Sequence, residues 1–165
     1  MGLISNGACV EDRWRHLSDE ETLPKAGAVI VPLARLPEAF AVSGLDIGVV
    51  VPNVTEIAAL ESALPRVALI AISFPAFSDG RGFSLARLIR RAGFKGELRA
   101  SGRLIADQYG HAIACGFDTL EIAQDIAQRQ DAEQWRVAYA AHARAYQQGY
   151  AGRGSILDER RKAAQ

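Results

Sequence analysis

The sequence predicts an α/β domain built on an open, mainly parallel five-stranded sheet with helices on both faces. Short apolar runs rich in β-branched residues alternate along the chain with segments of helical spacing. The apolar runs show little polar alternation, which is typical of parallel strands covered on both faces. Five strands are too few for a closed eight-stranded barrel, so a partial βα barrel is the alternative arrangement.

The predicted strands are short and bounded by Gly, Pro or Asn. They cover residues 28–33, 47–51, 67–72, 98–100 and 119–122. The third run stays apolar from Val67 to Ile72 and is followed by Ser73. Because it lacks polar alternation, we expect this strand to be central and buried on both of its faces.

The predicted helices lie between and after these strands, at residues 37–41, 54–63, 84–92, 103–114 and 125–148. Asn53 and Glu56 resemble a capping box at the start of the second helix. The region before the first strand lacks a regular period. We therefore divide the chain into an N-terminal arm across the domain (1–26), a single α/β domain (27–148) and a mobile C-terminal tail (149–165).

Composition narrows the class of protein. The 165 residues suit one domain, and 19 basic residues balance 19 acidic ones, which argues against nucleic acid or an anionic membrane as the main partner. Two cysteines are too few for a thiolate metal site, and no cofactor motif is present, so we expect neither a metal nor a bound cofactor. With no export signal and no membrane-spanning run, we expect a cytoplasmic protein.

The candidate site is the segment that follows the third strand. Ligands of parallel sheets bind outside the carboxyl ends of the strands, where helix N-termini present free amides. Arg81 offers a two-pronged fork for an oxyanion, Asp79 can hold that guanidinium, and Ser84 is placed to cap the next helix. The predicted anion-binding residues are Asp79, Gly80, Arg81, Gly82, Ser84, Ser101 and Arg103. The alternative is a structural turn in which Asp79 and Arg81 pair with each other.

Other candidates have simpler interpretations. Cys115 stands where a helix ends at Gly116, and a helix C-terminus raises the pKa of a thiol, so we expect a small buried side chain. His111 lies four residues before Cys115 and four after Asp107, a spacing that is common on helix surfaces. No catalytic residue is assigned.

Several of these segments together resemble a known family. They are Ile30-Val31-Pro32-Leu33, the run from Leu69 to Leu88, Gly96-Glu97-Leu98-Arg99-Ala100, Asp107-Gln108 and Cys115-Gly116-Phe117-Asp118. The chain is similar over residues 25–148 to the bacterial domain-of-unknown-function 934 family. The most specific part is Phe-Pro-x-Phe-x-Asp-Gly-Arg-Gly-Phe/Tyr-Ser at residues 74–84.

The resemblance implies a cytoplasmic role near assimilatory sulfur metabolism. Members are often encoded beside sulfite reductase and labelled oxidoreductases of sulfite reduction. The family signature falls on Phe77, Asp79, Gly80, Arg81, Gly82, Ser84, Arg87, Gly96, Glu97, Leu98, Arg99, Gly102, Asp107, Gln108, Cys115, Gly116 and Phe117. This chain departs from the family at Arg103, where members carry an acidic residue.

Two functions remain open at this point, and with them the question of whether the protein is an enzyme. The first is an accessory or anion-binding protein of sulfite reduction, with sulfite reductase and a small oxyanion as partners. The second is an enzyme that acts on a small phosphorylated or sulfur-containing metabolite at the carboxyl ends of the strands. Homo-oligomers are compatible with both.

Overall fold

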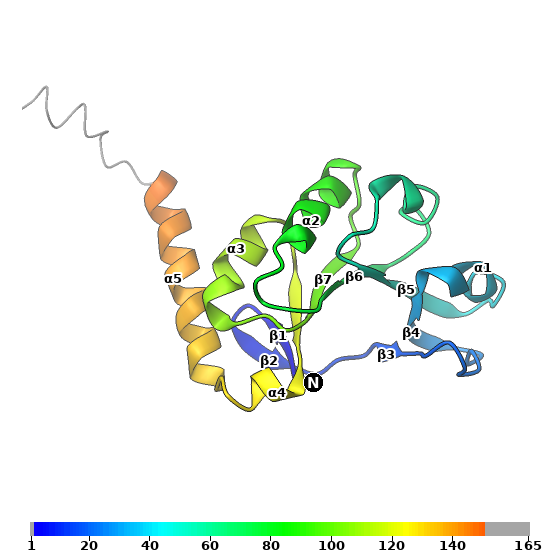
Figure 1. Cartoon of the computed structure of the whole chain (residues 1–165), viewed down its shortest axis with the longest axis horizontal. Coiled ribbons are helices and arrows are strands. Elements are labelled where there is room, and N and C mark those ends of the chain that lie inside the picture. The colour runs from blue at the N-terminus through cyan, green and yellow to red at the C-terminus, as the bar shows by residue number, and fades with distance from the viewer. Residues whose placement is uncertain (1, 151–165) are drawn as a thin grey trace, which may run out of the picture.

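The computed structural model describes residues 2–150, with side chains to residue 143. Eight strands form one sheet in the order β2-β1-β8-β7-β6-β5-β4-β3. Their bounds are β1 Gly2–Ser5, β2 Ala8–Val10, β3 Arg15–His16, β4 Gly27–Pro32, β5 Leu45–Pro52, β6 Leu69–Phe74, β7 Glu97–Gly102 and β8 Thr119–Ile122. The sheet thus holds the five predicted strands, β4 to β8, and three N-terminal ones (Figure 1).

The helices follow the strands in alternation. Their bounds are η1 Leu33–Arg35, α1 Leu36–Ala39, η2 Ile57–Ala59, α2 Arg81–Arg91, η3 Ala106–Gln108, α3 Tyr109–Ala114, α4 Gln124–Ala127 and α5 Ala132–Tyr150. Short 3-10 helices are labelled η. The first, η1, leads directly into α1, and η3 leads directly into α3.

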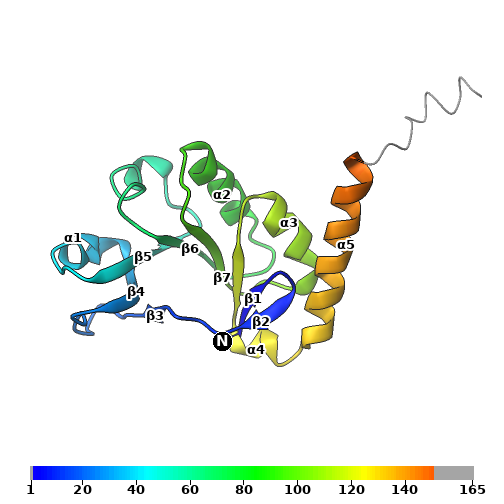
Figure 2. The same cartoon turned by 180° about the vertical axis from the view of Figure 1, so that it is seen from behind.

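The predicted open sheet with helices on both faces is wrong, and the alternative of a partial βα barrel fits. Strands β3 to β8 are all parallel and lie side by side in chain order, so the order never reverses. Right-handed crossovers between successive neighbours place their connections on one face of the sheet. Helices α1, α2 and α3 accordingly cover the same convex side, and the sheet curls into a half-barrel (Figures 1 and 2).

Strand β6 confirms the prediction of a central strand buried on both faces. Leu69, Ile70, Ala71 and Ile72 have no exposed surface. Ile70 and Ile72 belong to the main core under the helices, whereas Leu69 and Ala71 form a small cluster with Trp14 on the concave face. The second face is therefore covered by the N-terminal segment rather than by helices.

The curl brings the two ends of the parallel sheet together. His16 on β3 lies 3.0 Å from the Glu121 carboxylate on β8, although four strands stand between β3 and β8 in the sheet. A flat sheet with neighbours about 4.8 Å apart would keep these side chains well over 20 Å from each other. We call the face that they share the inner face.

The N-terminal region takes a direct part in the sheet. Strand β1 pairs antiparallel with β8 and with β2, and β3 pairs with β4 at the opposite edge. The connection from β2 to β3 crosses the inner face, where Trp14 packs. The domain division stays a prediction, and most of the predicted tail, residues 151–165, lies outside the described residues.

Two local predictions about helix starts are wrong. The segment predicted as a helix at 54–63 forms only the 3-10 turn η2, with Glu56 rather than Asn53 at its N-cap. Helix α2 begins at Arg81 with Gly80 at its N-cap, so Ser84 lies inside the first turn and does not cap it. Serine inside a first turn and serine at an N-cap give similar sequence patterns, and tertiary packing decides between them.

Candidate functional site

The segment after β6 is a loop of residues 75–80 that ends at α2. The Arg81 guanidinium donates two hydrogen bonds to the Asp79 carboxylate, from Nε to Oδ1 at 2.9 Å and from Nη2 to Oδ2 at 2.6 Å. The backbone N–H of Arg81 also donates to Oδ1 at 3.3 Å. The fork of Arg81 is therefore occupied by Asp79, and its remaining N–H groups face solvent, since the side chain is 65% exposed.

A depression of about 440 Å³ lies between the η2 segment and α2. Its lining includes Asn53, Thr55, Arg81 and Ser84, with an apolar floor that contains Leu85. Asn53 is only 6% exposed, and its amide nitrogen Nδ2 is buried without a hydrogen bond of normal length and angle. Such a group is rare in folded proteins because a lost hydrogen bond costs about 1–3 kcal/mol.

The electrostatics of this depression centre on Asp79. The hydrogen bonds from Arg81 lower the pKa of Asp79 far below its usual range, and the neighbouring Asn53 amide adds to the effect without reaching full hydrogen-bond geometry. Asp79 also raises the pKa of Arg81. The pair is ionised at neutral pH, but its two charges cancel. The guanidinium N–H groups of Arg81 that Asp79 does not bind therefore belong to an ion pair with no net charge.

The other predicted anion-binding residues do not join this pair. Ser101 lies on the inner face beside Glu121, with which it is paired in the sheet, and it helps to lower the pKa of Glu121. Arg103 forms an ion pair of 2.7 Å with Asp125. Gly82 is packed so tightly that a Cβ atom would lie 2.4 Å from the ring of Phe74. Ser84 alone shares the depression with Arg81.

The region around Cys115 matches its simpler interpretation. Cys115 is 2% exposed, and Gly116 adopts the left-handed conformation that ends α3. The Cys115 sulfur lies 3.6 Å from Nε2 of His111, whose ring packs edge-on against Phe83. This is a packed helix end with a weak polar contact.

A second polar cluster, which we did not predict, lies on the inner face around Arg99. The Arg99 side chain is fully buried and donates to Asp12 at 2.5 Å and to Glu97 at 2.9 Å. Glu121 lies 3.8 Å from the same guanidinium, and Thr119 donates to Glu97 at 2.7 Å. Burial alone would lower the pKa of Arg99, but these carboxylates outweigh it and raise the value. We call this the inner-face cluster.

Glu121 links the cluster to His16. Burial alone would raise the pKa of Glu121, but the hydrogen bond and charge of His16, the Ser101 hydroxyl and the charge of Arg99 together lower it. An ionised carboxylate only accepts hydrogen bonds, so Nε2 of His16 must carry the proton that it shares with Glu121. In a neutral imidazole the other ring nitrogen, Nδ1, is the hydrogen-bond acceptor. This arrangement orients an imidazole in the way that acid–base catalysts require.

The sequence did contain a signal for the inner-face cluster. Glu97, Arg99 and Ser101 alternate with apolar residues along β7, which is longer than the strand predicted at 98–100, and Thr119 and Glu121 do so along β8. Period-two polarity of this kind contradicts a strand covered by helices on both faces and indicates a polar second face. The roles of Asp12 and His16 could not be predicted in this way, because polar and apolar residues do not alternate regularly in the N-terminal region.

The described residues hold no group of three or more His, Cys, Asp or Glu side chains that could bind a metal ion. Within the same part of the chain, no helix has the length and apolar character needed to cross a membrane.

The chain matches the model of a protein family. None of the curated proteins is significantly similar to the chain. The family described as "Bacterial protein of unknown function (DUF934)" matches residues 48–157, which are two thirds of the sequence and include the whole loop before α2. The match confirms the resemblance found in the sequence, and the chain belongs to this family.

Proposed function

We propose that the protein is an accessory, anion-binding protein of assimilatory sulfite reduction, and that a small oxyanion such as sulfite binds in the depression beside Arg81. The association with sulfite reduction rests on the resemblance to the family, because members of that family are often encoded beside sulfite reductase. The anion site rests on the geometry of Asn53, Arg81 and Ser84.

The observation that carries the anion site is the buried amide of Asn53, which makes no hydrogen bond of full geometry and lies in the wall of a depression that also holds a fixed arginine. Asp79 keeps the Arg81 guanidinium in one orientation at the first turn of α2. The first turn of an α-helix also carries the positive end of the helix dipole, which favours an anion. Ser84 adds a hydroxyl donor on the same side.

The same geometry limits the affinity. Asp79 neutralises Arg81, and Glu56 adds a further negative charge to the lining, so the site attracts anions through local donors rather than through net charge. Exposed charge pairs contribute little in water and are screened by salt. We therefore expect weak binding that falls as ionic strength rises.

Thermal shift with sulfite, sulfate and phosphate tests the site, with sodium chloride at matched ionic strength as the reference. The wild type is expected to gain stability with sulfite. Arg81→Lys keeps the charge but loses the planar fork, so the binding free energy should weaken by about 1 kcal/mol, the lower end expected for an exposed charge-assisted contact.

Arg87→Lys is the matched control, because Arg87 is exposed on the same helix outside the depression. It should respond to sulfite as the wild type does. A wild type that none of the three anions stabilises would overturn the anion site. Sedimentation velocity of the chain mixed with purified sulfite reductase tests the accessory role, which fails if no complex forms.

A second candidate function is favoured by His16 and Glu121. Inward-facing residues near the carboxyl ends of barrel strands are the usual catalytic positions of βα barrels, and Glu121 is the third of the four residues of β8. On this alternative, the protein is an enzyme acting on a small phosphorylated or sulfur-containing metabolite. Nδ1 of His16 would take a proton from the substrate while Nε2–H stays bound to Glu121.

Turnover assays with a panel of such metabolites distinguish the two functions. On the enzyme alternative, His16→Gln abolishes turnover, while Arg81→Lys leaves it unchanged. Absence of turnover by the wild type across the panel, with sulfite binding retained, contradicts the enzyme and supports the accessory protein.

A further inference from the structure

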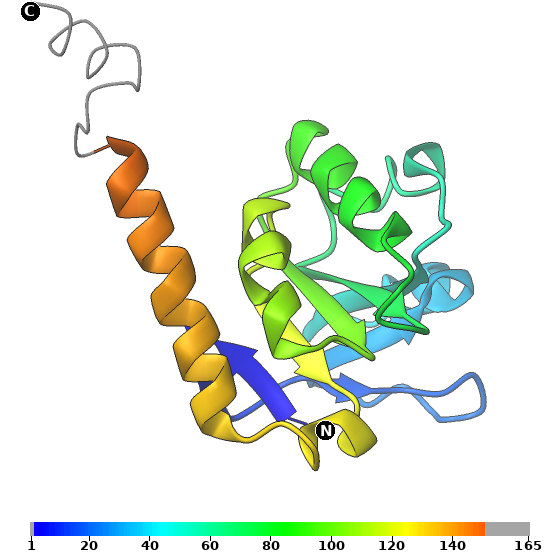
Figure 3. The same ribbon diagram turned by 60° about the vertical axis from the view of Figure 1, so that its left-hand side comes forward.

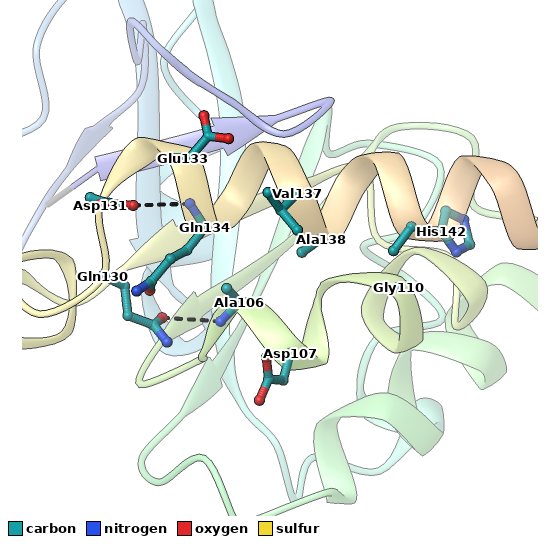
Figure 4. Close-up of a pocket in the computed structure, with 11 residues that line it drawn as sticks. Ala106, Asp107, Gly110, Gln130, Asp131, Glu133, Gln134, Val137, Ala138 and His142 are labelled. Atoms are coloured by element: carbon teal, nitrogen blue, oxygen red, sulfur yellow. Dashed lines mark hydrogen bonds between the residues drawn. The ribbon is translucent and has the colours of Figure 1, made fainter.

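A groove of about 960 Å³ runs between α5 and the η3–α3 segment (Figure 4). Its floor is made of small and apolar side chains, among them Ala106, Gly110 and Ala138. Val137 projects from α5 toward the groove and is 56% exposed, which is unusual for valine on a helix that packs against the domain. The groove shares no lining residue with the depression beside Arg81.

Contacts at both ends hold the two walls of the groove in place. At one end the side chain of Gln130 accepts a hydrogen bond of 3.0 Å from the backbone N–H of Ala106. At the other end α3 and α5 touch, since a Cβ atom on Gly110 would lie 3.3 Å from Nδ1 of His142. Helix α5 leans out from the body of the domain beside this groove (Figure 3). The two walls of the groove are therefore held in place by contacts within the described residues.

The charged side chains in the lining are all carboxylates. Among the described residues that line the groove, Asp107, Asp131 and Glu133 are acidic and none is a lysine or an arginine. Arg136 compensates Glu133 through an ion pair from outside the lining, and Asp131 accepts from the backbone N–H of Gln134. Asp107 is exposed, and the described side chains form no ion pair with it. In a chain of zero net charge, this is a local acidic rim around an apolar floor.

We propose that this groove docks an amphipathic helix of a partner protein that carries lysine or arginine along the edges of its apolar face. A groove between two helices accepts the ridge of a third, and small side chains on the floor let the helix axes approach closely. The basic edges of that helix meet Asp107 and Asp131, and its apolar face covers Val137. The complementarity in charge sets the orientation and excludes acidic helices.

Fluorescence anisotropy with two labelled synthetic peptides tests this docking site on the full chain. The probe is an 18-residue helical peptide of leucine and lysine, and its control replaces every lysine by glutamate. The wild type is expected to bind the leucine–lysine peptide at least tenfold more tightly than the leucine–glutamate peptide. Binding should weaken as salt rises, because the rim contributes through charge.

Val137→Glu and Asp107→Lys are the test variants, and each should reduce binding of the leucine–lysine peptide at least tenfold. Both positions are exposed, and circular dichroism melts establish that the variants fold. Val54→Glu is the matched control, because Val54 is an equally exposed valine outside the groove, and it should bind as the wild type does.

Two outcomes overturn the proposal. One is equal binding of both peptides, or loss of binding in Val54→Glu as large as in Val137→Glu, because either result means nonspecific adsorption. The other is a wild-type dimer in sedimentation equilibrium that Val137→Glu dissociates, which assigns the groove to a second copy of this chain.

Discussion

Arg99 and Arg81 each pair with carboxylates, but in opposite surroundings. Arg81 is exposed and binds Asp79, two residues away in the loop before α2. Arg99 is buried in the half-barrel and binds Asp12, which lies 87 residues away in the sequence. The first pair closes a local turn, whereas the second ties the N-terminal segment to the middle of the sheet.

The difference teaches which pair the fold depends on. An exposed ion pair contributes about 0–1 kcal/mol, because water already solvates both partners. Removing one partner from a buried cluster leaves charges that water cannot reach, at a cost of about 3–5 kcal/mol. We therefore expect the inner-face cluster to govern stability and the Arg81 loop to be free to serve a ligand.

Arg99→Ala is expected to have the largest effect. It leaves Asp12, Glu97 and Glu121 without their shared cation and should lower the free energy of unfolding by about 3–5 kcal/mol. Urea denaturation followed by circular dichroism measures this loss. A loss below about 1 kcal/mol would remove the contrast with Arg81.

Glu121→Gln should destabilise the protein by about 2–3 kcal/mol at neutral pH, because a buried carboxylate loses its charge-assisted hydrogen bonds. The folded protein holds the pKa of Glu121 below its ordinary value of 4.5, so the stability from this group is present above that value and is lost as the pH falls through the folded pKa. The variant should therefore lose less stability than the wild type between neutral and acidic pH. Urea midpoints measured across that range check the slope, and parallel curves would contradict the prediction.

Gly82→Ala should cost about 1–3 kcal/mol, because the new methyl group would meet the packed ring of Phe74. Gly80→Ala is its control, since the nearest side-chain atom lies 3.9 Å away and the backbone conformation suits alanine. Thermal melts of the two variants compare them directly. Equal melting temperatures would show that the ring of Phe74 moves aside for the new methyl group.

Arg81→Ala is expected to have the smallest effect on stability, at most about 1 kcal/mol. Its Asp79 partner stays partly hydrated and keeps the backbone N–H of residue 81 as a donor. Urea denaturation in parallel with Arg99→Ala measures the contrast. A loss near that of Arg99→Ala would mean that the loop is a structural element first.

Much of the fold followed from local patterns. The five strands β4 to β8 lie where apolar, β-branched runs predicted them, because a buried strand is recognised by the apolar side chains of its own residues. The helix end at Cys115 and Gly116 was also predicted, since a left-handed terminus favours glycine. The pairing of Asp79 with Arg81 was foreseen as one alternative, because the two residues are near neighbours.

What the sequence alone determined about this protein is its α/β class, its family and the local contacts of the loop before α2. The tertiary structure decided the strand order, and with it the half-barrel. Alternating strands and helices give the same sequence pattern in an open sheet with helices on both faces and in a half-barrel. It also decided the inner-face cluster, since His16 and Glu121 meet only when the sheet curls. Contacts between residues so distant depend on the global path of the chain, which no short stretch of sequence encodes.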